Sequence, residues 1–176
     1  CHPRGGQQAR DKTQPWIGKC LSCASIAQNR RPVWDVRYRA MSEKFNLTLA
    51  LRPVYPLAIR QPDFFEKNHP NWLSYTIRDM MRVAQFHDIP FGAPRPDPIV
   101  QNPATREIAA EQPYIRHVTR MGQAAARKGR GIAFAHEAGQ LIWGGQPDWH
   151  EGDHLARALE RAGLDAGEIE AEVKDQ

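Results

Sequence analysis

This chain of 176 residues is 41% hydrophobic and 25% charged, a composition that is ordinary for one globular domain with a core of its own. The sequence contains no apolar run near the ~18–20 residues that a membrane-spanning helix needs, and its N-terminus shows no apolar stretch of signal-peptide length. We therefore expect a soluble, cytoplasmic protein that does not have a membrane as its partner.

The positive charge is concentrated near the N-terminus. Residues 1–45 hold nine Lys or Arg against three Asp or Glu, so the formal net charge of +4 comes entirely from this segment. Its basic residues are not interleaved with aromatic ones and no recognition helix follows, which disfavours nucleic acid as a partner. We expect residues 1–33 to be irregular. Because Cys1, Cys20 and Cys23 all lie there, the rest of the fold cannot rely on disulfides.

The first regular elements are expected after residue 33. Residues 34–45 can form a short helix, and residues 47–55 form a dense apolar run of strand length closed by Pro53 and Pro56. This is the only good strand that the pattern indicates. Since a single strand cannot satisfy its own backbone groups, it should either pair with a strand formed from the first 33 residues or remain an unpaired edge.

From residue 71 onward the periodicity predicts helices. An amphipathic helix over residues 71–90 is followed by a Pro-rich loop, a second helix capped by Asn102 and kinked or divided at Pro113 on its way to Gly129, and a third over 132–143. Further helices should precede Gly163 and follow Asp165, where Asp165 and Glu168 can form a capping box. We expect a common core formed by Leu73, Ile77, Met80, Met81, Ile108, Ile115, Val118, Leu141, Leu155 and Leu159.

The residues His150, Glu151 and His154 have the His-Glu-x-x-His spacing of a zinc peptidase, in which two His on one helix face share a metal. A structural interpretation is favoured, because Asp148 followed by Glu151 can form a capping box at the start of a helix. Gly152 and Asp153 are also unlike the apolar pair expected inside a buried zinc helix. We therefore expect no metal, and expect His150→Ala to leave any activity unchanged.

Three segments carry a resemblance to a known family: "LALRPVYPLAIRQPDFF", "IRDMMRVAQFHDIPFGAPRPDP" and "LIWGGQPDWHEGDHLARALERAGLD". Together, over roughly residues 36–176, they resemble the DsbA-like thioredoxin superfamily, in its branch of 2-hydroxychromene-2-carboxylate isomerases and kappa-class glutathione transferases. The resemblance implies a mainly α chain within an α/β thioredoxin-like fold. Residues 34–56 would supply a helix and one sheet strand, and residues 57–176 the all-helical insertion domain.

The resemblance also implies a function. Glutathione would be the cofactor, a small aromatic compound the substrate, and a homodimer the assembly. In this family the glutathione thiolate adds to a conjugated double bond, the bond rotates and the thiolate leaves, which gives cis-trans isomerisation. Asn68, in "EKNHPNW", falls near the position where the kappa-class pattern places a glutathione-contacting Asn, and a structural loop Asn before His-Pro is the open alternative. The family's sequence pattern also matches this chain at Arg52, Tyr75 and Trp143. We assign these three residues no catalytic role.

The sequence departs from the family at both ends. Where the family has a Ser-Pro-Trp-like segment whose Ser activates the glutathione sulfur, this chain reads "SIAQNRRPV" shortly before Trp34, and it stops at Gln176 before the family's cis-proline segment. No catalytic residue is therefore assigned. The expectation is a truncated or frame-disrupted product that binds glutathione weakly or not at all.

Two alternatives stay open. Cys20-Leu-Ser-Cys23 has the Cys-x-x-Cys spacing of a DsbA-type thiol-disulfide oxidoreductase, in which the helix dipole lowers the pKa of the first thiol. The context is poor, because a weak strand precedes the pair and Arg30-Arg31-Pro32 interrupts the segment after it. The other alternative is a catalytically inactive helical domain that serves as a binding or interaction module.

Overall fold

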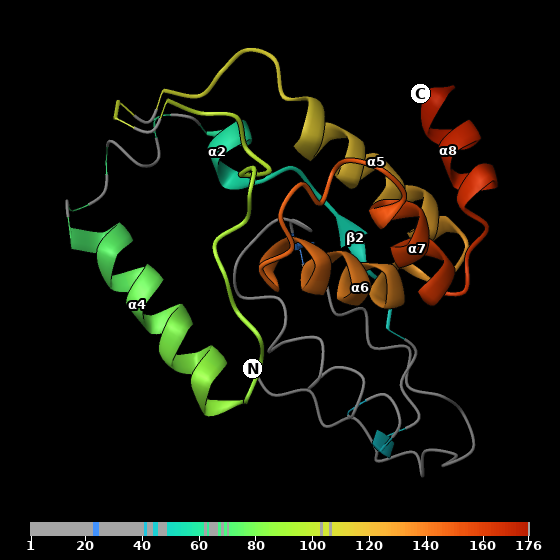
Figure 1. Ribbon diagram of the computed structural model, residues 1–176, viewed down its shortest axis with the longest axis horizontal. Coiled ribbons are helices and arrows are strands. Elements are labelled where there is room, and N and C mark those ends of the chain that lie inside the picture. The colour runs from blue at the N-terminus through green and yellow to red at the C-terminus, as the bar shows by residue number, and fades with distance from the viewer. Residues whose placement is uncertain are drawn as a thin grey trace, which may run out of the picture.

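The computed structural model describes residues 23–24, 41, 44–45, 49–61, 63, 67, 69, 71–102, 104–105 and 107–175, leaving out the side chains of 23, 24 and 73. Figure 1 shows helices α5 to α8 packed together, strand β2 beside them, and helix α4 standing apart. Of the predicted helix over residues 34–45, only Met41, Lys44 and Phe45 are described, and all three are helical.

Two short strands form the described sheet. Strand β1 (Cys23–Ala24) and strand β2 (Arg52–Pro53) pair in parallel, with Cys23 opposite Arg52 and Ala24 opposite Pro53. Pairing with the first 33 residues was one of the two expected outcomes, and it is confirmed at these positions. The predicted extent of the strand, residues 47–55, is wrong for residues 49–51 and 54–55. Pro53 has no N–H to donate to a ladder, which limits how far the strand can continue.

Helix α2 (Leu57–Arg60) comes directly after β2 and buries Ala58. The side chain of Arg60 folds back, and its Nε donates a hydrogen bond of 3.0 Å to the backbone oxygen of Tyr55. Pro56, at the N-cap, supplies an extended backbone that lets the chain turn from strand to helix. Strand β2 is therefore followed by a short helix that has a proline at its N-cap.

Four helices make the core: α5 (Pro113–Arg127), α6 (Gly131–Trp143), α7 (His154–Arg161) and α8 (Ala166–Lys174). Helix α5 contacts α6, α8 and β2, and α7 packs between α6 and α8. The residues they bury in one cluster are Val118, Met121, Ala124, Ala125, Phe134, Ala138, Ile142, Trp143, Trp149, Leu155, Leu159, Ala162, Leu164, Ile169 and Val173. No helix in the described part of the chain is long and apolar enough to cross a membrane.

Glycines end two of these helices as expected. After α5, Gly129 has φ +72° and the Arg130 amide donates to the Ala125 oxygen at 2.8 Å. After α7, Gly163 has φ +76° and the Leu164 amide donates to the Leu159 oxygen at 3.0 Å. This pairing of a left-handed residue with a bond back across the last turn is a Schellman motif, which satisfies otherwise free helix carbonyls.

The second helix begins later than the sequence predicts. It starts at Pro113, whereas Asn102 lies in a loop where its Oδ1 accepts hydrogen bonds from the amides of Ala104 and Thr105 at 2.9 and 3.2 Å. An antiparallel bridge between Gln101 and Ile108 closes that loop. The reason is that proline is tolerated in the first turn of a helix but clashes with the preceding turn inside one.

The expected capping box at Asp148 is also wrong. Asp148 has φ +48° and lies in a turn, Gly152 has φ +59°, and α7 begins only at His154, with no side-chain cap from Asp153. Two left-handed residues within five positions are incompatible with a continuous helix from 148. The second expected capping box is half confirmed, because Asp165 Oδ1 accepts from the Glu168 amide at 2.7 Å.

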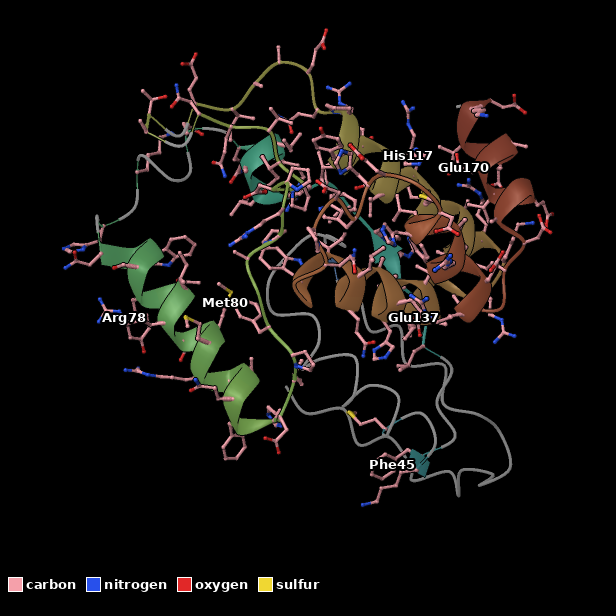
Figure 2. All side chains as sticks on the ribbon, viewed as in Figure 1. Phe45, Arg78, Met80, His117, Glu137 and Glu170 are labelled. Atoms are coloured by element: carbon pink, nitrogen blue, oxygen red, sulfur yellow. The ribbon has the colours of Figure 1, made fainter. Side chains whose placement is uncertain are left out.

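Ion pairs lie at the rim of the bundle (Figure 2). His117 Nε2 lies 3.2 Å from Glu170 Oε1, and Arg161 Nε lies 2.6 Å from Glu137 Oε2. Lys128 pairs with Glu168, and that hydrogen bond raises the pKa of the lysine. The Glu168 side chain is thus turned toward α5 instead of its own helix start. Exposed pairs of this kind contribute little each, about 0–1 kcal/mol.

Helix α4 (Asn71–Phe86) is confirmed as a helix but only partly as a core element. Met80 and Ala84 are buried, at 7% and 6% exposure, while Ile77 and Met81 are 43% and 48% exposed. Figure 2 shows Met80 and Arg78 on opposite sides of this helix. The prediction that Ile77 and Met81 join the common core is therefore wrong, because α4 does not pack into the bundle.

Candidate functional site

A seam of two parallel segments, residues 91–98 and residues 143–150, is the best candidate for a functional site. The Gly92 amide donates to the Trp143 oxygen at 2.7 Å, and the Asp148 amide donates to the Arg95 oxygen at 2.8 Å. Arg95 also forms a parallel bridge with Pro147. We refer to these two segments as the seam. It brings the Pro-rich loop, which the sequence left without a role, against the ends of α6 and α7.

Close packing at one end of the seam depends on glycine. A Cβ on Gly92 would lie 3.1 Å from the Gly145 Cα, so a larger residue would force the two backbones apart. This approach stacks Phe91 on Trp143, with ring centroids 5.9 Å apart and planes only 7° from parallel. Trp143 is 6% exposed, and its Nε1 has no acceptor among the described residues. This end offers a buried tryptophan stacked on a half-buried phenylalanine, and an unused donor.

The other end of the seam is an aromatic corner. Trp149 is fully buried, and its Nε1 donates to the Pro96 oxygen at 2.8 Å. Tyr114, from the first turn of α5, meets the Trp149 ring at 6.1 Å and the His150 ring at 4.6 Å. Aromatic edges and faces attract one another in such arrangements, about 0.5–1.5 kcal/mol per pair. The corner therefore joins the Tyr114 ring to the rings of two consecutive residues, Trp149 and His150, from a distant part of the chain.

His150 is the titratable group of this corner. Its side chain is 20% exposed, and its Nδ1 has no hydrogen-bond partner among the described residues. Its Nε2 lies 3.6 Å from Glu151 Oε1, which is too far for a good hydrogen bond. An imidazole nitrogen can donate or accept a hydrogen bond, so the buried Nδ1 of His150 is an unused polar atom among the described residues. Chemically, His150 is the seam's candidate acid or base.

The Pro-rich loop is held against α5 by Gln112, which is 3% exposed. Its Oε1 accepts from the Val100 amide at 2.9 Å, and its Nε2 donates to the oxygens of Val100 and Ala109 at 2.7 and 2.9 Å. The Gln112 side chain thus pairs with the backbone of the loop in the way that the backbone of a neighbouring strand would. It makes the loop a part of the bundle.

Asp97 shapes the loop within the seam. Its Oδ1 accepts from the Ile99 amide at 2.8 Å, which closes a turn. Neighbouring atoms displace water from the carboxyl and raise its pKa, while this hydrogen bond lowers it. The residue as a whole is nevertheless exposed. Because its hydrogen bond to the Ile99 amide closes the turn, Asp97 has a structural role in the loop.

The His-Glu-x-x-His residues do not share a helix face. His150 and Glu151 lie in the turn before α7, and His154 is the first residue of that helix. The His154 Nε2 is 3.4 Å from Gln146 Nε2, away from the aromatic contacts of His150. Among the described residues, no group of three or more His, Cys, Asp or Glu side chains is placed to hold a metal ion.

The other residues singled out in the sequence are scattered. Asn68 and Cys20 lie outside the described residues, and Cys23 lies in β1. Arg52 is exposed in β2, and Tyr75 is 64% exposed on α4. The glutathione contact at Asn68 and the redox pair Cys20 and Cys23 therefore stay predictions.

Sequence reasoning missed Tyr114, Trp149 and Gln112 as members of the site. Gln112 is at the N-cap position of α5 but makes no cap bond, and its bonds to Val100, 12 residues earlier, have no local sequence signal. Trp149 and Tyr114 are 35 residues apart, with nothing local to indicate their contact. Only the fold brings them together.

Comparison with known proteins adds one finding. No family model matches this chain, and no curated protein matches it in sequence. Among solved structures, the selenomethionine form of 2-hydroxychromene-2-carboxylate isomerase (HCCA isomerase) is similar, with a TM-score of 0.54 and 16% identity. The match covers 86% of this chain and 68% of that chain. At this identity the likeness establishes a similar fold.

Proposed function

We propose that this chain is a glutathione-dependent isomerase or transferase that acts on conjugated aromatic compounds similar to 2-hydroxychromene-2-carboxylate. The observation that carries the proposal is the likeness of its fold to HCCA isomerase over 86% of the chain. The proposal is supported by three segments whose sequences resemble those of the same group of proteins. These segments are residues 49–65, 77–98 and 141–165. We further propose that β1 and β2 belong to a thioredoxin-like sheet and that α4 to α8 form its helical insertion.

The described residues provide part of what glutathione binding requires. Glutathione carries two carboxylates, which a guanidinium recognises well. Arg52 is exposed in β2, and its side chain has no hydrogen-bond or ion-pair partner among the described residues. We therefore propose Arg52 as a carboxylate contact, beside the contact that the resemblance implies at Asn68. When bound, glutathione would supply a thiol that adds reversibly to a conjugated double bond.

The seam gives the chain's own residues two further roles in this proposal. The half-buried ring of Phe91, stacked on Trp143, offers an apolar surface for an aromatic substrate. We also propose His150 as the acid or base for a phenolic substrate, and this proposal replaces the expectation that His150→Ala leaves activity unchanged. Both roles need the substrate to lie along the seam.

The first experiment measures turnover with the full chain. The cis-to-trans conversion of a 2-hydroxychromene-2-carboxylate is followed by absorbance with glutathione or with S-methylglutathione, which has the same carboxylates and no free thiol. We expect conversion only with glutathione, and saturation only at about millimolar glutathione, because the residues before Trp34 do not match the family's activating segment. Equal rates with both compounds would contradict the proposal, as would no conversion at any concentration.

The second experiment tests Arg52 by calorimetry with the same two ligands. Arg52→Gln should weaken binding of both about tenfold, because one charge-assisted contact is lost. Arg116→Gln on α5 is the matched control, since Arg116 is also an exposed arginine without an ion-pair partner among the described residues. A similar loss in both variants would show that overall charge, and not Arg52, governs binding.

The oxidoreductase alternative has a separate test. If the chain reduces an insulin disulfide and Cys20→Ser abolishes that reaction, thiol-disulfide exchange is its activity. An insulin assay with no reaction, beside thiol-dependent isomerisation, would favour the isomerase. If neither reaction occurs, the remaining alternative is a helical module that acts through binding.

A further inference from the structure

Helix α6 carries a glycine that close packing against the described residues does not explain. Gly139 is buried in the middle of this helix, where glycine is less favourable than alanine. A Cβ at Gly131, in the same helix, would lie 3.0 Å from Ala126, so that glycine permits a close approach. A Cβ at Gly139 would meet no described atom within 4 Å beyond its chain neighbours and its own helix backbone. Among the described residues, Gly139 therefore borders open space.

One turn further along α6, Trp143 supplies a polar atom without a partner. The residue is 6% exposed, and its buried Nε1 has no acceptor among the described residues. Trp149, by contrast, donates its Nε1 to the Pro96 oxygen at 2.8 Å. A buried donor without a partner has given up its hydrogen bonds to water, and such donors are rare in folded proteins. The Nε1 of Trp143 therefore indicates an acceptor that comes from a ligand.

Gly139 and Trp143 lie on the same side of α6. Residues four apart in a helix are about 40° apart around the axis and about 6 Å apart along it. The Trp143 ring makes its contact with Phe91, with stacked centroids 5.9 Å apart, and leaves the space beside Gly139 open. We call Gly139, Trp143 and Phe91 the α6 subsite. It combines open space, a stacked aromatic pair and an unused donor.

The charge on this side of α6 indicates the kind of ligand. Glu137 is the only Asp, Glu, Lys or Arg of the helix, and it lies about 160° from Gly139 around the axis. Its carboxylate pairs with Arg161 Nε at 2.6 Å. A buried charge needs an opposite charge or several hydrogen bonds, and the Trp143 side chain offers one neutral donor. The ligand atom at Nε1 should therefore be a neutral acceptor, such as a carbonyl oxygen.

We propose that the α6 subsite binds the neutral carbonyl group of a small aromatic ketone or aldehyde. The carbonyl oxygen accepts from Trp143 Nε1, and an apolar part of the compound occupies the space beside Gly139. The choice of compound rests on the proposed function, because thiols add to double bonds that a carbonyl group activates. Any carboxylate of the compound stays outside the subsite. The sequence assigned Trp143 no catalytic role, and the proposal gives it a binding role.

The first test follows the indole N–H groups by NMR in the isotope-labelled full chain, without glutathione. The probe is benzylideneacetone, a neutral aromatic ketone, which should bind with a dissociation constant of about 1 mM. The Trp143 signal, identified by its absence in Trp143→Phe, should move during the titration. The Trp149 signal should stay, because its acceptor is the Pro96 oxygen. A Trp143 signal that does not move up to about 5 mM ketone would overturn the proposal and leave water as the partner of this donor.

Two related compounds separate the hydrogen bond from the apolar contact. The first is the hydrocarbon with a methylene group in place of the carbonyl oxygen, and the second is cinnamate, which has a carboxylate there. Each should bind about tenfold more weakly than the ketone. In Trp143→Phe, which keeps a ring to stack on Phe91, ligand-observed NMR should show the ketone binding only as well as the hydrocarbon. A preference for the ketone that persists in Trp143→Phe would contradict the proposal.

Gly139→Leu tests the open space. The leucine should weaken ketone binding about tenfold, whereas Gln85→Leu, which adds the same side chain at an exposed position of α4, should leave it unchanged. Far-UV circular dichroism should show the same helix content in both variants. If Gly139→Leu loses helix content, Gly139→Ala takes its place, with an expected loss of about threefold. Full binding in a folded Gly139 variant would show that the compound does not lie beside α6.

The subsite and the proposed function can fail separately. Thiol-dependent isomerisation together with an unmoved Trp143 signal would reject the subsite and keep the function. Ketone binding at Trp143 in a chain that isomerises nothing at any glutathione concentration would keep the subsite and reject the function.

Discussion

Helices α4 and α5 are nearly equal in length, at 16 and 15 residues, and both are amphipathic by sequence. Helix α5 buries its apolar side completely, with Ile115, Val118 and Met121 all at 0% exposure. Helix α4 buries Met80 and Ala84 and leaves Ile77 and Met81 nearly half exposed. Helical periodicity therefore identifies the residues that share a side, but not whether a neighbour covers that side.

The difference lies in the connection that leaves each helix. A tight turn at Gly129 leads α5 directly into α6, which packs back against it. Gly131 makes this approach close, since a Cβ there would lie 3.0 Å from Ala126 and 3.1 Å from Leu51. Helix α4 instead leads into the long loop that enters the seam. Short connections favour packing between neighbours, and a long one releases that constraint.

The largest expected contrast is between two phenylalanines. Phe134→Ala in α6 should lower the free energy of unfolding by about 3–5 kcal/mol, because Phe134 is fully buried and leaves a cavity. Phe86→Ala on α4 should change it by less than about 0.5 kcal/mol, because Phe86 is 80% exposed. Urea unfolding of the two variants and the unmodified chain measures both. Equal losses would mean that α4 is as well packed as the bundle.

A second prediction concerns where the bundle ends. Gln112→Leu should cost about 2–3 kcal/mol, because the backbone groups of Val100 and Ala109 lose their partners in a part-buried site. Hydrogen exchange at the Val100 amide should also become faster. Gln101→Leu, in the same loop but exposed, is the matched control and should cost less than about 0.5 kcal/mol. If Gln112→Leu costs no more than Gln101→Leu, the loop is not part of the bundle.

The smallest expected effect is the loss in free energy of unfolding when the N-cap residues of two bundle helices are replaced. Asp165→Ala should cost about 1 kcal/mol, because it removes the side-chain cap on the Glu168 amide. Asp153→Ala, at the N-cap of α7, should cost about 0.5 kcal/mol or less, because Asp153 makes no cap bond and only an exposed pair with Arg157. A larger loss for Asp153 would mean that α7 is capped in solution.

The success of each sequence prediction depended on the range of the interaction behind it. The third helix, the end of α7 at Gly163 and the cap at Asp165 were all predicted, because each depends on residues within a few positions. The helix expected from Asn102 and the capping box at Asp148 were wrong. In both places a local alternative existed, an Asx turn at Asn102 and left-handed backbone at Asp148 and Gly152. Only the surrounding structure selects between such alternatives.

The candidate site was less predictable than the fold. The sequence by itself determined the apolar sides of the helices, their glycine ends and the Pro-rich loop between α4 and α5. It also determined the presence of His150, but as part of a suspected metal motif. Only the tertiary structure decided that His150 packs on Tyr114, that Trp149 donates to Pro96, and that Ile77 and Met81 of α4 stay exposed. Those contacts join residues 35 or more positions apart, and no local propensity depends on such partners.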